Sequence, residues 1–283
     1  MANSPVVAAW ELGVRLRQCR DAAGMTTTTA AKGARCTQGY VSDVERGNTR
    51  VSLDKLNALL RIYDVEAGEA AELRALREEV LLRGWWQEYS AIFDPVVLRM
   101  FGLEHGAVTV RAHQSLLITG LLQTTEYAHA LGGGDPIFRS ADLQPRMEAR
   151  MTRQRRLDGE DPLRLSVVMS EGALRQQVGG PEVMRRQLQH LAATIDTHEN
   201  VDVRIVPFTA SRYSALGAGT FHIYEFDSPR LPAVLYQESV SYAELIDRAA
   251  LVREYSVAWD DGAQVALDRE QSLALIRRVE TEM

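Results

Sequence analysis

Cysteine and long apolar runs are scarce in this chain of 283 residues. Its two cysteines, Cys19 and Cys36, are too few for a disulfide framework. No stretch approaches the roughly 18 consecutive apolar residues that a membrane-spanning helix needs. The amino-terminal residues lack the basic, apolar and cleavage regions of a signal peptide. These absences favour a cytoplasmic protein, and the 46% of hydrophobic residues are enough to build a buried core.

Patterns typical of catalytic and metal sites are also missing. The six histidines show no metal-ligand spacing. The glycine run Gly132–Gly134 is followed by Pro136 rather than by the Lys-Ser or Lys-Thr of a phosphate loop. Ser170-Glu171-Gly172 lacks the first glycine of a nucleophile elbow. We therefore expect no enzyme activity, no cofactor and no metal.

Charge is divided unevenly along the chain. The formal net charge is −6. Residues 1–63 hold nine Lys or Arg against five Asp or Glu, a net charge of +4, which leaves −10 for the remainder. A basic head on an acidic body is typical of a protein that contacts phosphate groups with one end only.

The first 83 residues are predicted to form an all-α bundle of five helices. Thr26, Thr37 and Ser52 can each cap a helix, because a side-chain oxygen accepts a free backbone N–H there. Gly47 can end the third helix in the conformation that glycine favours. The first helix is expected to end near Gly24. The other four are expected to cover residues 26–32, 37–46, 52–63 and 66–83.

Residues 84–283 are predicted to form an α+β domain. Segments rich in Val, Ile, Phe and Tyr predict strands, at residues 164–170, 201–207, 219–227 and 233–238. Helices are expected at residues 106–131, 140–157, 181–196, 241–257 and 263–281. We expect one mostly antiparallel sheet of about four strands, with helices on one side.

The stretch from Met25 to Asn48 carries the clearest functional pattern. Two short helices are joined by a tight turn, and the second opens on small polar side chains, which is the geometry that presents a helix end to the major groove of DNA. Val41 and Val44 are expected to pack inward and turn a polar face outward. The candidate base-reading residues on that face are Thr37, Gln38, Gly39, Ser42 and Asp43.

These side chains differ in what they can read. The amide of Gln38 can bond N7 and N6 of adenine together, and Gly39 leaves room for close approach of a base. Asp43 could accept a hydrogen bond from cytosine N4 or repel the DNA. Helix ends and basic flanks suit phosphate contacts. The candidate phosphate-binding residues are Thr26, Thr27, Tyr40, Arg46, Asn48, Thr49 and Arg50.

The segment from Leu12 to Val65 resembles the repressor-type (XRE, Cro/cI-like) helix-turn-helix domain. The residues that carry the resemblance are Leu12–Arg17, Gly24–Thr26, Tyr40–Ser42, Glu45–Gly47 and Leu53–Leu56. It implies that Gln38, Gly39, Ser42 and Asp43 face the bases. Thr27 stands where glutamine is usual. Arg35 stands where glycine is usual, and a left-handed backbone there costs about 1 kcal/mol.

Residues from about 85 to 280 resemble the uncharacterised carboxy-terminal domain of WhiJ-like actinobacterial regulators. The matching stretches are Trp85-Trp86, Gly120–Ala128, Arg150–Arg155, Ser170–Leu174, Val178–Gly180, Met184 with Gln187-Leu188, Asn200-Val201, Pro207 and Gly219–Phe221. Thr119 departs from the family, which usually has proline there. The resemblance implies a small acidic partner protein, encoded nearby, that relieves DNA binding.

Together these features predict a sequence-specific regulator that binds double-stranded DNA as a homodimer, because one recognition helix reads few base pairs. One alternative is a partner-holding module of an antitoxin or anti-repressor pair, and another is a small-molecule sensor. In the body, residues 146–156 are expected to form a solvated helix face or a contact surface for an acidic partner or ligand. Glu171 could act as an acid or base, but we expect it to pair with Arg150, Arg153 or Arg155. Trp85-Trp86 are expected to pack between domains rather than to form a stacking platform for bases.

Overall fold

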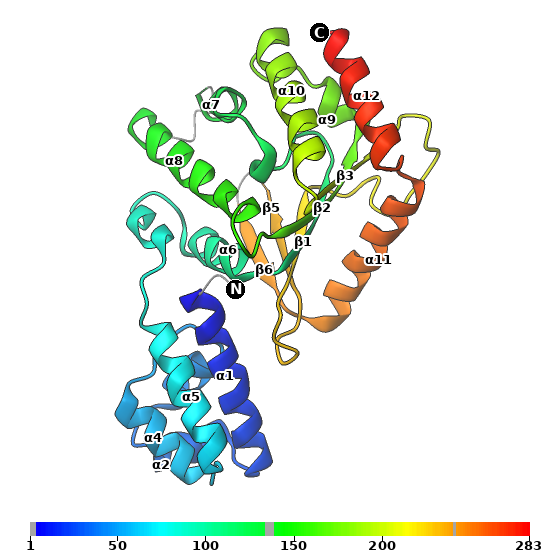
Figure 1. Cartoon of the computed structure of the whole chain (residues 1–283). Coiled ribbons are helices and arrows are strands. Elements are labelled where there is room, and N and C mark those ends of the chain that lie inside the picture. Colours follow the sequence, from blue (N-terminus) through cyan, green and yellow to red (C-terminus); the bar gives the residue numbers. More distant parts are fainter. Residues whose placement is uncertain (1–3, 134–138, 240–241) are drawn as a thin grey trace. The chain divides into compact units, whose positions relative to one another are not determined.

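The computed structural model describes residues 4–133, 139–239 and 242–283, which divide into two compact units (Figure 1). The first unit comprises Met1–Gln87, Phe101–Gly106 and Asp227–Leu231. The second comprises Glu88–Met100, Ala107–Phe226 and Pro232–Met283. The boundary expected between residues 83 and 84 stays a prediction.

The predicted helices of the head are present in the first unit. They are α1 (Pro5–Ala22), α2 (Thr27–Gly33), α3 (Gln38–Glu45), α4 (Leu53–Ile62) and α5 (Ala67–Val80). The hydroxyls of Thr26, Thr37 and Ser52 accept backbone N–H groups at the starts of α2, α3 and α4. Gly47 follows α3 with a φ of +67°. The capping signals in the sequence therefore mark real helix ends.

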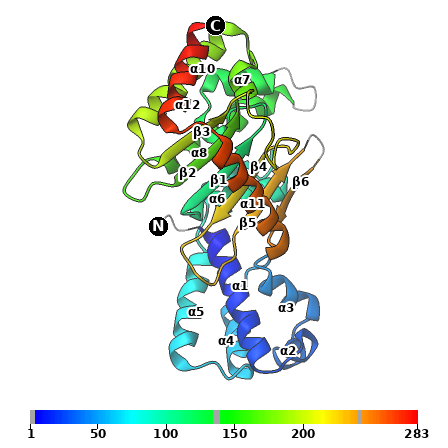
Figure 2. The same cartoon turned by 90° about the vertical axis from the view of Figure 1, so that its right-hand side faces the viewer.

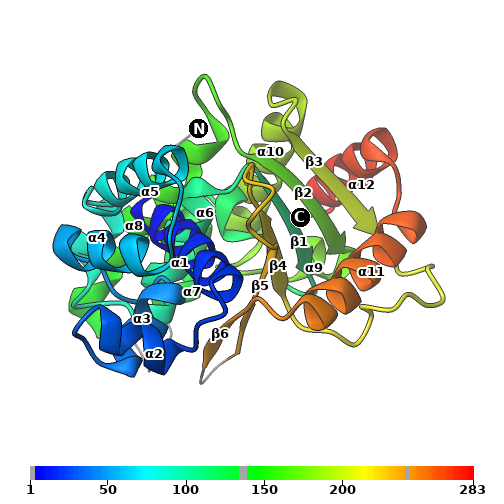
Figure 3. The ribbon, with the colours of Figure 1, turned by 90° about the horizontal axis from the view of Figure 1, so that it is seen from below.

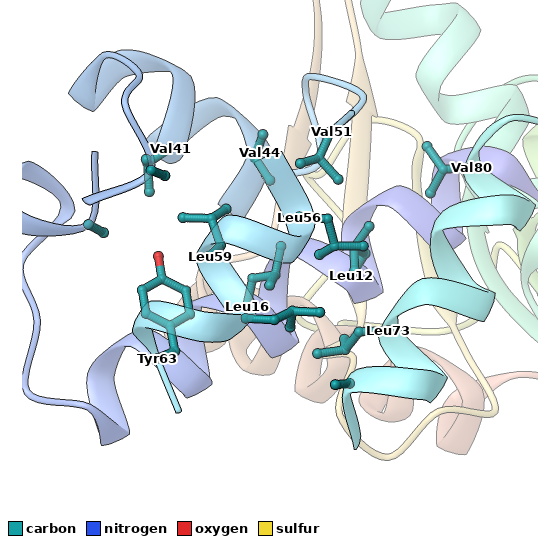
Figure 4. Close-up of a cluster of buried hydrophobic side chains, with 14 of the residues drawn as sticks. Leu12, Leu16, Val41, Val44, Val51, Leu56, Leu59, Tyr63, Leu73 and Val80 are labelled. Atoms are coloured by element: carbon teal, nitrogen blue, oxygen red, sulfur yellow. The ribbon is translucent and has the colours of Figure 1, made fainter. Parts of the chain in front are cut away.

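One apolar core holds these five helices together (Figure 4). Leu12 and Leu16 of α1 meet Leu56 and Leu59 of α4, and all four side chains are at most 2% exposed. Figure 4 shows Val41, Val44, Val51, Tyr63, Leu73 and Val80 completing the cluster. Since α2 and α3 are only seven and eight residues long, packing rather than intrinsic propensity stabilises them.

The second unit is built around a sheet. Its strands are β1 (Thr109–Gln114), β2 (Arg164–Ser170), β3 (Val201–Val206), β4 (Phe221–Glu225), β5 (Val234–Glu238) and β6 (Ala243–Ile246). The longer helices that follow the head are α6 (Pro95–Gly106), α7 (Thr125–Gly133), α8 (Leu143–Gln154), α10 (Pro181–Thr197), α11 (Ala249–Val265) and α12 (Arg269–Thr281). The shorter ones are η1 (Trp85–Tyr89), η2 (Gly120–Leu122), η3 (Ser140–Asp142), η4 (Arg155–Leu157) and α9 (Glu171–Arg175). Helices α10 and α12 lie side by side (Figure 2).

The sheet corrects the predicted topology. It has six strands in the order β3-β2-β1-β4-β5-β6, and Figure 3 shows this order. The pairs β1–β2 and β2–β3 are parallel, and the other three are antiparallel. The expectation of a mostly antiparallel sheet of about four strands was therefore wrong. The helix α10 lies between β2 and β3 in the chain, and a helical crossover joins strands that run in the same direction.

Two strands lie where the sequence predicted helices. β1 occupies part of the predicted helix 106–131, and β6 occupies the start of the predicted helix 241–257. Helix α7 ends at Gly133, whereas Gly134 and Pro136 of the glycine run lie outside the described residues. No helix in the described part of the chain combines the length and apolarity needed to cross a membrane.

Candidate nucleic-acid interface

The turn between α2 and α3 is closed by hydrogen bonds to the end of α2. The Cys36 N–H donates to the Ala31 carbonyl at 2.9 Å, and the Arg35 N–H donates to the Lys32 carbonyl at 3.3 Å. This pair of bonds is the Schellman arrangement, which requires a left-handed residue after the helix. Arg35 is that residue, with a φ of +51°, as its position in place of the usual glycine predicted.

A lysine from α4 holds the same turn. The Lys55 ammonium donates to the Ala34 carbonyl at 2.9 Å and to the Arg35 carbonyl at 2.7 Å. A cation is favourable at a helix carboxyl end, where the carbonyl dipoles are negative. Sequence reasoning placed Lys55 only in the family framework, and nothing in its spacing indicated that it binds the turn.

The backbone of α1 lies directly against the end of α3. A Cβ atom built on Gly13 would come within 2.5 Å of the Val44 carbonyl oxygen and 2.6 Å of the Glu45 carbonyl oxygen. One built on Gly47 would come within 2.7 Å of the Trp10 Cα atom. Only residues without a side chain permit this approach, so two glycines set the distance between α1 and α3.

A buried ion pair fixes the orientation of α3. The Arg20 Nε and Nη2 atoms donate to the two Glu45 carboxylate oxygens at 2.6 and 3.0 Å, and Nη1 donates to the Met25 carbonyl at 2.7 Å. The two charged side chains are 10% and 7% exposed. The hydrogen bonds to Glu45 raise the pKa of Arg20 above its ordinary value. Arg20 therefore joins α1 to the end of α3 and the start of α2.

The structure turns the polar face of α3 outward, as predicted. Val41 and Val44 are 1% and 2% exposed in the core. The candidate base-reading residues lie on the other side: Thr37, Gln38 and Gly39 are exposed, and Ser42 and Asp43 are half-buried. A Cβ on Gly39 would meet nothing closer than the Thr37 hydroxyl at 4.0 Å. The open space that we expected beside this glycine is present.

Two of the candidate residues contact each other across the motif. The Gln38 amide nitrogen donates to the Thr27 hydroxyl at 3.2 Å. This bond joins the first residue of α2 to the first residue of α3, so the base-reading and phosphate-binding candidates meet at one point. Thr37 uses its own hydroxyl to accept the Tyr40 N–H at 3.1 Å.

Asp43 carries a cation beside it. The Arg46 guanidinium lies 2.7 Å from the Asp43 carboxylate, one turn further along the chain. Because the side chains are 63% and 44% exposed, such a pair adds at most about 1 kcal/mol to stability. Its effect is electrostatic, because the guanidinium offsets the negative charge of the carboxylate on this face.

The remaining phosphate-binding candidates surround this face. Thr26, Asn48 and Arg50 are exposed, and Thr49 is half-buried. The Thr26 hydroxyl accepts the Thr29 N–H at 3.1 Å. Tyr40 is half-buried against the core. The assigned DNA contacts of all these residues stay predictions.

Three arginines of α8 and η4 bind distant parts of the body with their guanidinium groups. Arg146 donates to the Ile92 carbonyl at 2.9 Å and Arg156 to the Ala107 carbonyl at 3.0 Å. Arg150 donates to the Gln123 side chain at 2.7 Å. The expectation of a solvated helix face was therefore wrong for these three arginines, whereas Glu148 and Arg155 are exposed.

Glu171 has partners other than the predicted arginines. Glu171 binds Arg175 at 2.8 Å and accepts the Phe208 N–H at 2.9 Å, rather than pairing with an arginine of residues 150–155. The Trp85 ring stacks on Phe101 within the first unit. No group of three or more metal-binding side chains occurs in the described ranges.

Comparison with known proteins finds two families, each matching a different part of the chain. Residues 11–73 match the family described as "Helix-turn-helix domain". Residues 97–278 match the family described as "Domain of unknown function (DUF5753)". No curated protein and no solved structure matches the chain. The second match covers well over half of the 283 residues. The chain therefore belongs to the DUF5753 family and is a helix-turn-helix DNA-binding regulator.

Proposed function

We propose that the protein is a sequence-specific transcriptional regulator of the WhiJ-like, XRE type, which reads operator DNA with α3. The observation that carries the proposal is the two-sided character of α3. Val41 and Val44 anchor the helix in the core, while Thr37 and Gln38 stand exposed at its amino end. The end of a helix held in this way is the part that enters the major groove.

The chemistry of the exposed face assigns different tasks to its residues. The Gln38 amide can bond adenine N7 and N6 together, and the Thr27 hydroxyl holds that amide beside the start of α2. The Asp43 carboxylate can accept from cytosine N4. Arg46, which lies beside Asp43, then offers its guanidinium to a phosphate.

The proposal extends to the body on the strength of the WhiJ-like resemblance. The DUF5753 domain would supply dimerisation, and a small acidic partner protein would relieve DNA binding. The regulator would act as a repressor in the cytoplasm and would catalyse no reaction. Recovery of bound DNA and co-purifying protein from one pull-down tests both halves of this scheme, and recovery of DNA alone would remove the partner.

The assignment of α3 is tested by comparing Gln38→Ala with Arg50→Ala on DNA selected by the full-length protein. Loss of a bidentate base contact costs about 1–3 kcal/mol at one base pair and relaxes specificity there. Loss of a phosphate contact weakens binding to every sequence and lowers the salt slope by about one. Titrations at several salt concentrations separate the two effects. Equal weakening of Gln38→Ala on all sequences would show that Gln38 does not read a base.

A further inference from the structure

The two edge strands of the sheet, β3 and β6, differ in whether their outer backbone groups are hydrogen-bonded. Those of β3 have partners. The Ile205 N–H donates to the Ser272 hydroxyl, and the Leu267 N–H donates to the Ile205 carbonyl, both at 2.9 Å. The Arg269 guanidinium covers the Val201 carbonyl. Leu267 and the first turn of α12 therefore occupy outer hydrogen-bonding groups at both ends of β3. Such covering is how proteins keep a sheet edge from pairing with another strand.

Among the described residues, nothing covers the opposite edge, β6, in this way. It is the last strand in the sheet order, at the outer end of the sheet in Figure 3. Within residues 4–133, 139–239 and 242–283, no segment other than β5 hydrogen-bonds to its backbone. In the part of the chain that the structure describes, outer groups of β3 are therefore occupied, and those of β6 are not.

The hairpin bond fixes which groups of β6 point outward. The Ser239 N–H donates to the Tyr242 carbonyl at 2.8 Å, so this pair is hydrogen-bonded. Hydrogen-bonded and non-bonded pairs alternate along an antiparallel ladder. Glu244 and Ile246 therefore direct their backbone groups toward β5. Ala243 and Leu245 direct theirs away from the sheet.

We propose that the outer edge of β6 pairs antiparallel with β6 of a second copy of this chain, joining two sheets across a two-fold axis. The inference rests on the proposed function, because a regulator that reads a two-fold operator needs a two-fold interface. At the two-fold axis of such a pair, β6 lies beside β6 of the second copy. The same outward groups then serve as donor and acceptor for both copies.

Register is restricted by symmetry. Residues that lie opposite each other in an antiparallel pair have their side chains on the same face of the sheet. When the two-fold axis is perpendicular to the sheet, one residue must therefore lie opposite the same residue of the second copy, and the axis passes between them. An axis at Glu244 would set two carboxylates directly opposite, which is destabilising. An axis at Ile246 would carry the ladder into the start of α11, where Arg248 already precedes the helix.

An axis at Leu245 avoids both the opposed carboxylates and the overlap with the start of α11. The outward groups of Leu245 then bond Leu245 of the second copy, and those of Ala243 bond Asp247 of the second copy. On the other face, Tyr242, which is 61% exposed, lies opposite the exposed Arg248 of the second copy. An arginine over a tyrosine ring is a favourable contact. The edge is thus complementary to itself.

The first test is the mass of the full chain in sedimentation equilibrium, with no DNA present. We expect the unaltered protein to sediment at twice 31.5 kDa. Leu245→Pro and Ala243→Pro each remove an outward N–H, which proline on an edge strand can do without losing a bond to β5. Both should halve the mass while circular dichroism and thermal unfolding stay close to those of the unaltered chain.

The second test uses cross-linking and does not depend on proline. In the proposed register the Cα atoms of Leu245 and its copy lie about 5.5 Å apart, which a disulfide can bridge. Leu245→Cys should therefore form a covalent dimer with oxidised glutathione. Glu244→Cys is the matched control, because Glu244 and its copy would lie diagonally, about 7–8 Å apart, where a disulfide does not form readily.

The outcomes separate this inference from the proposed function. A monomeric unaltered protein, proline variants that remain dimeric, or cross-linking of Glu244→Cys in place of Leu245→Cys would overturn the β6 interface. DNA binding measured on the same samples is an independent readout. If the unaltered protein is a dimer that dissociates in the proline variants, but it binds no specific DNA, the β6 interface stands and the proposed function is wrong. If the unaltered protein is a monomer that binds specific DNA, the β6 interface is wrong and the proposed function stands.

Discussion

The close approach of α1 to α3 makes Gly13→Ala a sharp test of how the recognition helix is held. Inside an isolated helix, alanine is favoured over glycine by about 1 kcal/mol. Here the added methyl would lie 2.5 Å from the Val44 carbonyl oxygen, whereas ordinary contacts begin at 3.4 Å. Neither helix backbone can yield locally. Overpacking of this kind costs up to about 3 kcal/mol, and the helix preference for alanine offsets about 1 kcal/mol of it, so we expect a net loss of about 2 kcal/mol.

Hydrogen exchange of the full-length chain, followed by mass spectrometry, measures this loss in α1 and α3 separately from the body. A loss of 2 kcal/mol corresponds to roughly 30-fold faster exchange. Gly68→Ala in α5 is the matched control, because its added methyl meets nothing within 4 Å. It should slow exchange slightly. If Gly13→Ala protects α1 and α3 as well as Gly68→Ala protects α5, the inferred contact between α1 and α3 is wrong.

Three further predictions concern buried polar groups. Glu45→Gln leaves the buried Arg20 charge without an opposite charge, so the free energy of unfolding of the head should fall by about 3 kcal/mol in urea titration; retention of full stability would refute the pair. Lys55→Met removes the donor to two carbonyls of the turn that follows α2 and should cost about 1–2 kcal/mol by the same assay; no change would mean that water replaces the ammonium. Burial lowers the pKa of His113, so its neutral form stabilises the fold above about pH 6.5, and this stability is lost as pH falls through the folded-state pKa. His113→Gln should therefore show a smaller loss of stability on acidification than the unaltered protein, and parallel pH profiles would exclude the effect.

The head was predicted well because its signals are local. A hydroxyl at Thr26, Thr37 or Ser52 satisfies N–H groups two or three residues away, so the sequence around each cap contains the cause of the helix end. The left-handed turn at Arg35 was also predictable from its position. The outward face of α3 followed from the spacing of Val41 and Val44.

The groups that position α3 were not predictable. Arg20 and Glu45 are 25 residues apart in the chain, and Lys55 is about 20 residues from the carbonyls that it binds. Each is a charged side chain of ordinary type in a helix. The role of each side chain depends on how deeply it is buried and on which group it points toward. Both depend on how the helices cross.

In the body, β1 was missed because its six residues alternate weakly and adjoin a segment with helical spacing. Its strand conformation is fixed by neighbours on both sides, β2 and β4, which lie 50 residues or more further along the chain. The arginines of α8 were misjudged for a related reason. A dense run of charge predicts exposure, but Arg146 and Arg156 find backbone oxygens more than 45 residues away.

By itself the sequence determined where the helices of the head begin and end and which face of α3 stays polar, because caps and apolar spacing act within a few residues. It also determined the strands β2, β3, β4 and β5, whose apolar residues mark them individually. Only the tertiary structure decided the direction in which the strands pair, which edge of the sheet is closed, and how α3 is tied to α1. These features depend on backbone groups brought together from distant parts of the chain, and a backbone group leaves no mark on the residue type that carries it.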